Sequence, residues 1–403
     1  MDPSMRDKEC PVPQPFRAHL WSIIFISGLF FLTFISRFIF APLMPSIEKD
    51  LNITHSQAGS LFLMISLGFF VAQVCSGFLS SRVKHKGSLV ISILGVGLAL
   101  LIFNLSSSLL VIRGILFLLG MAAGLHMPSA MATITAMVNR QEWGKALAVQ
   151  QTAPPLSLVV GPLLAMLFLG WFSWRAILTI LGGVAIAAAL AFMRYGRCGD
   201  FPGDSPRPGL VKILIFQRSF WIMVVLFALA MGGSVGIYTM LPLFLVNERG
   251  YDGDWANTLL GLSRITVLFM PFVAGWLTDR IGEKSLIFIV MLLAGVATIM
   301  LGVLQGVWLL VILFVQPAVL GCYFTAGFAA LARIVQPNLR SIAASFTTPT
   351  AFLIGGGLLP TAMGYMGQAY SFGLGIVLIG CFTIIISGLV AFLKLIEKME
   401  EGC

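Results

Sequence analysis

Apolar stretches of roughly twenty residues alternate with short polar loops along the whole chain. A helix of that length crosses about 30 Å of hydrocarbon. The pattern therefore predicts an all-α integral membrane protein. We expect twelve transmembrane helices, at residues 20–43, 57–79, 88–107, 109–135, 146–169, 174–193, 220–245, 256–278, 285–304, 308–331, 342–366 and 371–393.

The composition agrees with a membrane protein. The chain is 58% hydrophobic and 10% charged, whereas soluble domains carry about 25% charged residues. Residues 1–19 are polar and proline-rich, so the first span itself, and not a cleaved signal peptide, is expected to direct insertion. The net charge of +9 lies in short loops, which argues against a nucleic-acid partner.

The positions of lysine and arginine predict the orientation, because positive loops stay in the cytoplasm. Most of these residues lie in loops on the side of the N-terminus. The opposite loops hold only Lys49, Arg175 and Arg249. Both termini are therefore predicted to be cytoplasmic, and the short loops suggest a bacterial inner membrane.

The two halves of the chain are related by a repeat. The segment from Gly77 to Arg82 recurs 198 residues later as Gly275 to Arg280, and the same offset aligns Pro162 with Pro360. This predicts two pseudo-symmetric six-helix bundles, of the kind that rock about a site near the bilayer midplane. The expected divisions are a tail (1–19), the first bundle (20–193), a linker (194–219), the second bundle (220–393) and a tail (394–403).

Three arginines, Arg37, Arg113 and Arg264, lie inside predicted spans, whereas all 16 acidic residues lie outside them. A charge at this depth is costly and generally belongs to a function. We expect the substrate to supply the missing negative charge, because a guanidinium fork suits a carboxylate or another oxyanion. Arg37 and Arg264 lie nearest the centres of their spans. Arg113 lies near the outer end, where it could serve structure alone.

Further side chains could complete an anion site. Tyr238 and Tyr323 would donate hydroxyl hydrogen bonds, and Gln151 could donate from its amide. Each could equally serve only as a contact between helices. His126 is the candidate for proton coupling, because an imidazole exchanges its proton near neutrality. Its alternative role is that of a hydrogen-bonded packing residue.

One loop carries a recognisable motif. Gly275-Trp-Leu-Thr-Asp-Arg-Ile-Gly-Glu-Lys284 resembles the loop signature of the major facilitator superfamily, and its first copy has Ser81 where the family has an acid. The resemblance extends over most of the chain. It implies the major facilitator fold and alternating access. It also implies conformational roles for Arg82, Asp279, Arg280, Gly161 and Pro162.

A narrower resemblance concerns the first and fourth helices. Ser36-Arg37 followed by Pro45-Ser-Ile47, and Gly120 to Pro128, are similar to motifs of the anion:cation symporter family. That resemblance implies that Arg37 binds an organic anion. The family's two acidic coupling positions are Ser36 and Ala123 here.

No phosphate-binding loop, catalytic triad or metal-ligand cluster is present in the sequence, so we expect neither an enzyme nor an ATP-driven pump, and no cofactor. We expect a monomeric secondary transporter that moves a small organic or inorganic anion, with a carboxylate favoured. It could be an exchanger, a uniporter or a proton-linked symporter. The alternative is a multidrug or metabolite efflux antiporter, suggested by Ser157 before Gly161-Pro162. A non-transporting sensor on a carrier scaffold would be expected to carry an added soluble domain.

Overall fold

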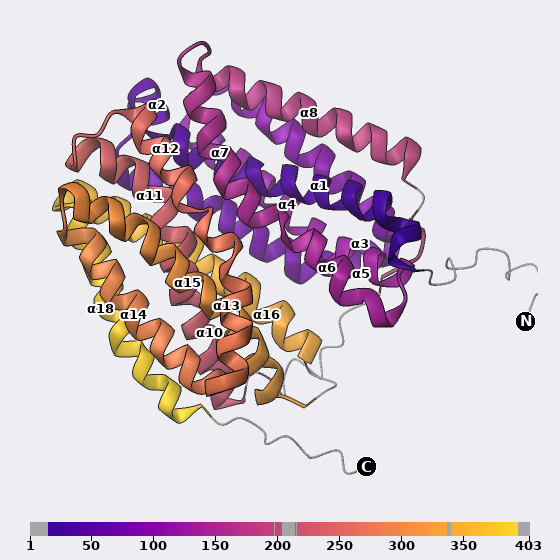
Figure 1. The fold of residues 1–403 in the computed structure, drawn as a ribbon. Coiled ribbons are helices and arrows are strands. Elements are labelled where there is room, and N and C mark those ends of the chain that lie inside the picture. Colours follow the sequence, from indigo (N-terminus) through magenta and orange to yellow (C-terminus); the bar gives the residue numbers. More distant parts are fainter. Residues whose placement is uncertain (1–14, 197, 204–213, 215, 337–339, 394–403) are drawn as a thin grey trace, which may run out of the picture.

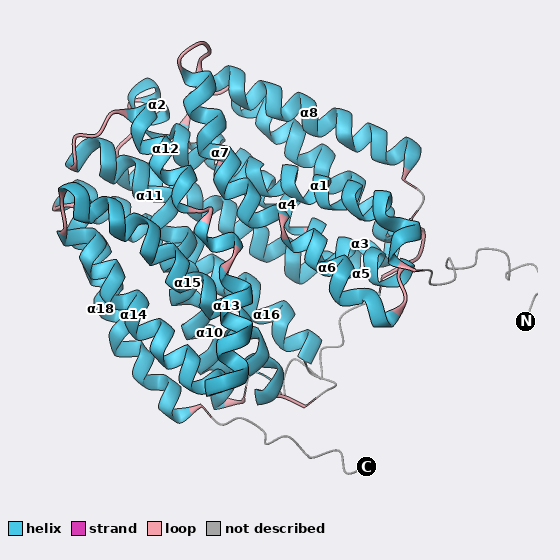
Figure 2. Cartoon of the chain, viewed as in Figure 1, coloured by secondary structure: helices cyan, strands magenta, loops and turns pink. Residues whose placement is uncertain are grey.

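The computed structural model describes residues 15–196, 198–203, 214, 216–336 and 340–393, and within these ranges it is helical without strands (Figure 2). The predicted tails and most of the predicted linker lie outside the described residues. The first half contains η2 (Phe16–His19), α1 (Leu20–Phe38), α2 (Phe40–Leu51), α3 (His55–Phe103), α4 (Leu109–Gly124), α5 (His126–Met137), η3 (Arg140–Glu142), α6 (Trp143–Gln151), α7 (Ala153–Leu169) and α8 (Trp174–Tyr195).

The second half repeats this plan (Figure 1). It contains α10 (Arg218–Met231), η4 (Gly232–Gly236), α11 (Ile237–Leu243), η5 (Phe244–Glu248), α12 (Gly253–Ser263), η6 (Thr266–Leu268), α13 (Met270–Ile281), α14 (Glu283–Val303), α15 (Gly306–Ile334), α16 (Arg340–Leu353), η8 (Ile354–Leu358), α17 (Leu359–Ala369), α18 (Phe372–Ser387) and η9 (Gly388–Phe392). Several spans therefore consist of two or three consecutive helical segments.

The predicted spans all have helical counterparts. Among the described residues, ten helical stretches are long and apolar enough to cross a membrane. One of these, α3, contains two predicted spans. Its backbone is not helical at Lys84, where φ is 64°, and this interruption separates the two spans. The segments α16, η8 and α17 together form the span predicted at 342–366. The all-α membrane fold is thus confirmed.

The first span is longer than predicted. A new helix, α2, begins at Phe40 and continues to Leu51, because Pro42 lies in its first turn, where a missing backbone N–H costs no hydrogen bond. Glu48 consequently lies in a helix and is only 9% exposed. Glu48 and Asp50 thus follow the predicted end of the first span, residue 43, within the continuous helical stretch Phe16–Leu51.

We call the end of the bundles that holds the loops at 81–86 and 138–142 and the described part of the linker the linker side, and the opposite end the far side. The buried apolar residues of the described chain form three clusters. One joins both bundles and includes Ile35, Tyr238 and Phe352. The other two each belong to one bundle and lie on its linker side. The bundles therefore share a core at mid-depth and on the far side, and they diverge toward the linker side (Figure 1).

Glycines allow the close approach of the bundles on the far side. A Cβ atom placed on Gly364 of α17 would lie 2.3 Å from the carbonyl oxygen of His55, and one on Gly59 of α3 would lie 2.6 Å from that of Pro360. The hydroxyl of Thr361 donates to the carbonyl oxygen of Gly59 at 3.2 Å. These contacts hold the far side closed, and only residues without a side chain fit there.

The described start of the linker is attached to the first bundle alone. The backbone N–H groups of His85 and Lys86 donate to the carbonyl oxygens of Phe201 and Gly199, at 3.2 and 2.9 Å. In addition, Gly203 N–H donates to the carbonyl oxygen of Ser80 at 3.1 Å. The segment therefore covers the linker-side loop between the second and third spans.

Candidate functional site

Arg37 lies at mid-depth on α1, and it is enclosed by aromatic rings. Its guanidinium carbon lies over four phenylalanine rings, at 4.7 Å from the centroid of Phe34, 5.5 Å from Phe38, 4.4 Å from Phe69 and 5.2 Å from Phe352. Phe352 belongs to the second bundle. The residue is 3% exposed, so the rings of both bundles shield this cation from lipid and from bulk water.

Arg264 occupies the corresponding depth in the second bundle. It follows the last residue of α12, at a break before η6, and it is 2% exposed. Its guanidinium carbon lies 4.8 Å from the ring centroid of Tyr238. Side chains at the break of a discontinuous helix commonly line binding sites in transporters.

The two arginines meet the two members of one aromatic pair. The rings of Phe38 and Tyr238 are 6.3 Å apart, edge to face. The hydroxyl of Tyr238 donates across the interface between bundles to the carbonyl oxygen of Leu158, at 3.1 Å. The tertiary structure thus links Arg37 and Arg264 through two adjoining rings at the bundle interface, and the Tyr238 hydroxyl there already donates to the backbone. Substrate binding by these residues stays a prediction.

Neither guanidinium has an ionic partner among the residues that the structure describes. In both arginines, Nε and Nη1 are buried without a hydrogen bond. Desolvated charges of this kind cost several kcal/mol unless they are paired. The centre of the molecule therefore carries two positive charges that lack a protein counter-ion within the described chain.

Other buried polar atoms near mid-depth also lack hydrogen bonds within the described chain. They are the hydroxyl groups of Ser36, Ser66, Tyr323 and Thr347, and Nε2 of Gln150. Tyr323 is fully buried, with its ring 5.2 Å from that of Phe227. Gln151 is exposed at the end of α6, and its neighbour Gln150 is buried. Buried polar groups generally find partners, so these atoms are available to a bound solute.

His126 lies at the start of α5 and is fully buried. Its ring is parallel to that of Phe30, with centroids 5.3 Å apart. Neither ring nitrogen makes a hydrogen bond of regular geometry, although the carbonyl group of Ile26 lies nearby. The centroid of the Phe30 ring lies 6.1 Å from that of Phe34, which is one of the rings that contact Arg37. His126 is therefore a neighbour of the arginine site, and its role in proton coupling stays a prediction.

The family model of the Major Facilitator Superfamily matches residues 26–356 and 254–402. The chain belongs to the Major Facilitator Superfamily. A bacterial homologue of the human lysosomal transporter Spinster, solved in an inward-facing and occupied conformation, has a TM-score of 0.77 and 15% identity, and the match covers 95% of this chain and 97% of that one. The D-xylose–proton symporter has a TM-score of 0.76 and 16% identity, covering 95% and 99%.

Three relatives in this superfamily differ in what they transport. The probable sulfoacetate transporter SauU of Cupriavidus necator is 23% identical over 64% of each chain. The D-galactonate transporter of Escherichia coli is 21% identical over 96% of this chain and 98% of its own. Multidrug resistance protein 2 of Bacillus subtilis is 23% identical over 81% and 84%. The protein is thus a membrane transporter of the Major Facilitator Superfamily, a group whose members are not enzymes.

The superfamily loop motif takes two different forms here. Asp279 and Arg280 are exposed at the end of α13, and the Arg280 guanidinium carbon lies 4.1 Å from the centroid of Trp276. In the first bundle Arg82 is exposed, and Lys84 forms an ion pair with Asp200 of the linker at 3.4 Å. A carboxylate therefore reaches the first loop from the linker, although Ser81 replaces the acid of the motif.

Gly161 and Pro162 lie inside α7, where it packs against α1. A Cβ atom on Gly161 would lie 3.7 Å from Cγ1 of Ile35, which is an ordinary contact. The hydroxyl of Ser157 donates to the carbonyl oxygens of Ala153 and Phe31. These contacts fit a packing role for Gly161 and Pro162 between α7 and α1. Their predicted conformational role stays a prediction.

Arg113 is satisfied within its own bundle. Its Nε and Nη2 both donate to the hydroxyl oxygen of Ser60 on α3, at 3.1 and 2.8 Å. This contact is consistent with the structural role considered for Arg113. Arg113 is therefore a suitable control for the two arginines at the centre.

The aromatic enclosure of Arg37 was not found from the sequence. Phe34 lies one helical turn before Arg37, so the spacing alone could have indicated it. Phe69 and Phe352 come from α3 and α16, and the repeat does not align them with each other. Both phenylalanines are far from Arg37 in the sequence, so no local pattern indicated that they contact it.

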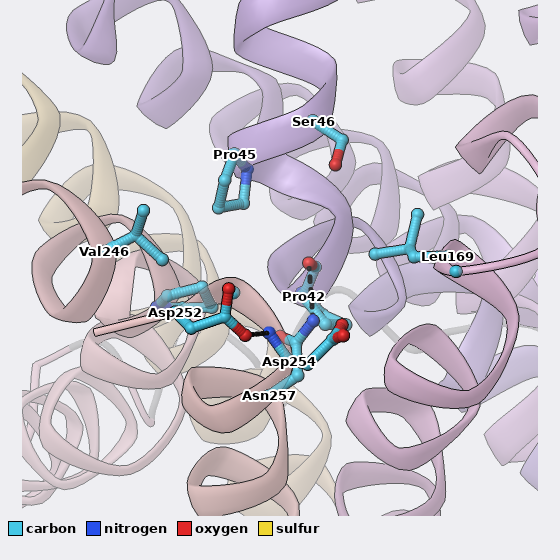
Figure 3. A pocket seen from close by; sticks show the side chains of 11 residues that line it. Pro42, Pro45, Ser46, Leu169, Val246, Asp252, Asp254 and Asn257 are labelled. Carbon is cyan, nitrogen blue, oxygen red and sulfur yellow. Dashed lines mark hydrogen bonds between the residues drawn. The ribbon is translucent and has the colours of Figure 1, made fainter. Parts of the chain in front are cut away.

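A pocket of about 210 Å³ lies between the bundles on the far side (Figure 3). Pro42, Pro45 and Ser46 line it from the first bundle, and Asp252, Asp254 and Asn257 from the second. The amide of Asn257 donates to the carbonyl oxygen of Pro42 at 3.4 Å. This hydrogen bond joins the two bundles at the pocket.

Replacing Tyr238 by phenylalanine is expected to weaken the closure of the far side. The change removes the hydrogen bond to Leu158 but keeps the ring against Arg264. One such bond contributes about 1 kcal/mol, which is roughly a fivefold change in the equilibrium between open and closed forms. Hydrogen–deuterium exchange should become faster in α7 and α11. Tyr365→Phe is the control, because Tyr365 is 61% exposed; equal exchange rates in the two variants would contradict the expectation.

Proposed function

We propose that this transporter carries a small organic or inorganic anion, with a carboxylate favoured, by alternating access between its two bundles. The far side would face the cell exterior and the linker side the cytoplasm of a bacterium. The excess of lysine and arginine in the linker-side loops supports this orientation. In this orientation the structure corresponds to a form closed to the outside.

The observation that supports the proposal is the pair Arg37 and Arg264. They come from different bundles, are almost fully buried, and contact the two rings of the pair Phe38 and Tyr238. No carboxylate within the described chain pairs with either arginine. An anion bound between them would neutralise both charges and join the two bundles.

The surroundings also favour an oxygen-rich anion. Aromatic rings occupy the faces of the Arg37 guanidinium, so its N–H groups remain in the plane for a planar, bidentate acceptor. The hydroxyl groups of Ser36 and Ser66 have no partner among the described residues. Ser66 is the repeat counterpart of Arg264. Together these groups can donate hydrogen bonds to the oxygens of a carboxylate, sulfonate or similar group.

The charges also bear on coupling. Two fixed positive charges repel each other in the empty carrier, and a bound anion removes that repulsion. Loaded carriers should therefore change conformation faster than empty ones, which favours exchange or uniport. Proton-linked symport is the remaining mode, and His126 is its candidate, because an imidazole normally exchanges its proton near neutrality. The names of the sulfoacetate and D-galactonate transporters fit an anionic cargo.

The test is a thermal-shift screen of the purified protein against small carboxylates, sulfonates and inorganic oxyanions. We expect at least one of these anions to raise the melting temperature of the wild type and of Arg113→Ala. The same anion should not stabilise Arg37→Ala or Arg264→Ala. Equal stabilisation of all four proteins, or of none by any anion, would contradict the proposal.

The second candidate function is efflux of a neutral or anionic drug. The similarity to multidrug resistance protein 2 and the aromatic rings around the centre favour it. Drug resistance that depends on this protein and is insensitive to Arg264→Ala would support that function over anion transport.

A further inference from the structure

A histidine and a buried carboxylate form a pair at the far side. His55 is the first residue of α3, and Glu48 lies near the end of α2. Nδ1 of His55 lies 3.0 Å from Oε1 and 2.9 Å from Oε2 of Glu48. Both residues line a cavity of about 580 Å³ together with Lys49 and Asn247, which gives water and protons a route to the imidazole.

The imidazole ring also contacts the second bundle. The rings of His55 and Phe372 have centroids 4.9 Å apart. The N–H groups of Phe372 and Gly373 donate to the carboxylate of Glu248 at the start of α18, so the position of the Phe372 ring is fixed within its own bundle. His55 therefore lies between a carboxylate of one bundle and an aromatic ring of the other.

We propose that His55 and Glu48 form a proton-binding site that controls closure of the far-side gate, with the protonated imidazole favouring the closed form. An imidazolium is attracted to the π face of an aromatic ring more strongly than a neutral imidazole is. Glu48 belongs to the same bundle as His55, and its contact can persist when the gate opens. The contact with Phe372 exists only when the bundles meet. A proton thus stabilises the closed form relative to the open form.

The charged groups around His55 are few. Among the described residues they are Glu48, Lys49 and Asp50 on α2, Arg113 on α4, and Glu248 with Arg249 at the end of η5. The helices α17 and α18, which pack against the start of α3 from the second bundle, contain no charged residue. Among these kinds of side chain, only an imidazole normally exchanges its proton between pH 5 and 8.

The test measures gate closure directly, without any substrate. Spin labels would be attached at Leu105 and Tyr370, which are exposed far-side residues of the two bundles. Their distance distribution would be recorded in the full-length protein at pH 5.5 and pH 8.5. We expect the ratio of closed to open protein to be roughly two- to fivefold higher at pH 5.5, the range that an imidazolium–ring contact provides.

Two variants assign the pH effect to this site. Both His55→Gln and Phe372→Leu should lose the pH dependence, and Phe372→Leu keeps the pair with Glu48 intact. The control is Asp50→Asn, which removes a separate far-side ion pair, with Arg175, that does not involve the second bundle. That variant should keep the full effect. No pH effect in the wild type, or an effect that survives in Phe372→Leu, would overturn the proposal, whichever solute the carrier moves.

Discussion

Arg264→Met is expected to abolish substrate transport and to leave the protein folded. The side chain has no ionic partner within the described chain, and its Nε and Nη1 have no hydrogen bond. Methionine has a similar length and carries no charge, so the substrate-free protein should melt at the same or a higher temperature. Hydrogen bonds to a charged group contribute about 1.5–3 kcal/mol each. Loss of two of them should weaken anion binding by roughly 10²–10⁴-fold.

Uptake of the anion identified by thermal shift, measured in proteoliposomes, checks this expectation. Arg264→Lys is the matched variant, because it keeps the charge and loses the planar fork. It should retain part of the binding. Transport at the wild-type rate by Arg264→Met would show that the guanidinium is not a substrate ligand.

Gly364→Leu is expected to hold the carrier open on the far side and to stop transport. Even a Cβ atom at this position would lie 2.3 Å from the carbonyl oxygen of His55 in the other bundle. Backbone atoms cannot yield as a flexible side chain can, so the bundles would have to separate. Overpacking typically costs 1–3 kcal/mol, which shifts the gate by roughly five- to 150-fold toward the open form.

The opening can be followed at Asn257, which is 3% exposed in the closed form. An Asn257→Cys substitution in a protein without its native cysteines should react slowly with a membrane-impermeant thiol reagent. The added Gly364→Leu change should make the reaction much faster. Gly183→Leu on α8 is the control, because a Cβ atom there meets nothing within 4 Å. Equal labelling rates in both backgrounds would show that the far side closes in spite of the added side chain.

The sequence predicted the fold well because membrane insertion imposes strong local rules. The length of the apolar stretches was enough to locate every span. Where a predicted span ended too early, the reason was local. At 20–43 the prediction ended the helix near Pro42, whereas Pro42 lies in the first turn of α2, which continues to Leu51 and includes Glu48. Superfamily membership was likewise foreseen from the loop beginning at Gly275, since that motif is contiguous in the sequence.

The site was only partly predictable. Arg37 and Arg264 stood out because a charge inside an apolar stretch is visible in the sequence alone. The rings of Phe69 and Phe352 did not, because phenylalanine is common throughout the chain, which holds 32 of them. The exposed position of Gln151 beside the buried Gln150 was also undetermined, since helix rotation depends on neighbouring helices.

The sequence alone indicated a helical membrane carrier built from two repeats, with positive charges inside its spans. The indications were the hydropathy pattern, the internal repeat and the isolated arginines. Each of these properties depends on residue type and order along the chain. The tertiary structure decided what surrounds those charges: the rings on Arg37, the contact of Tyr238 with both Arg264 and Leu158, and the pairing of His55 with Glu48 beneath Phe372. Among these contacts, those of Tyr238 with Leu158 and of His55 with Phe372 join residues far apart in the sequence, and they exist only once the two bundles are packed against each other.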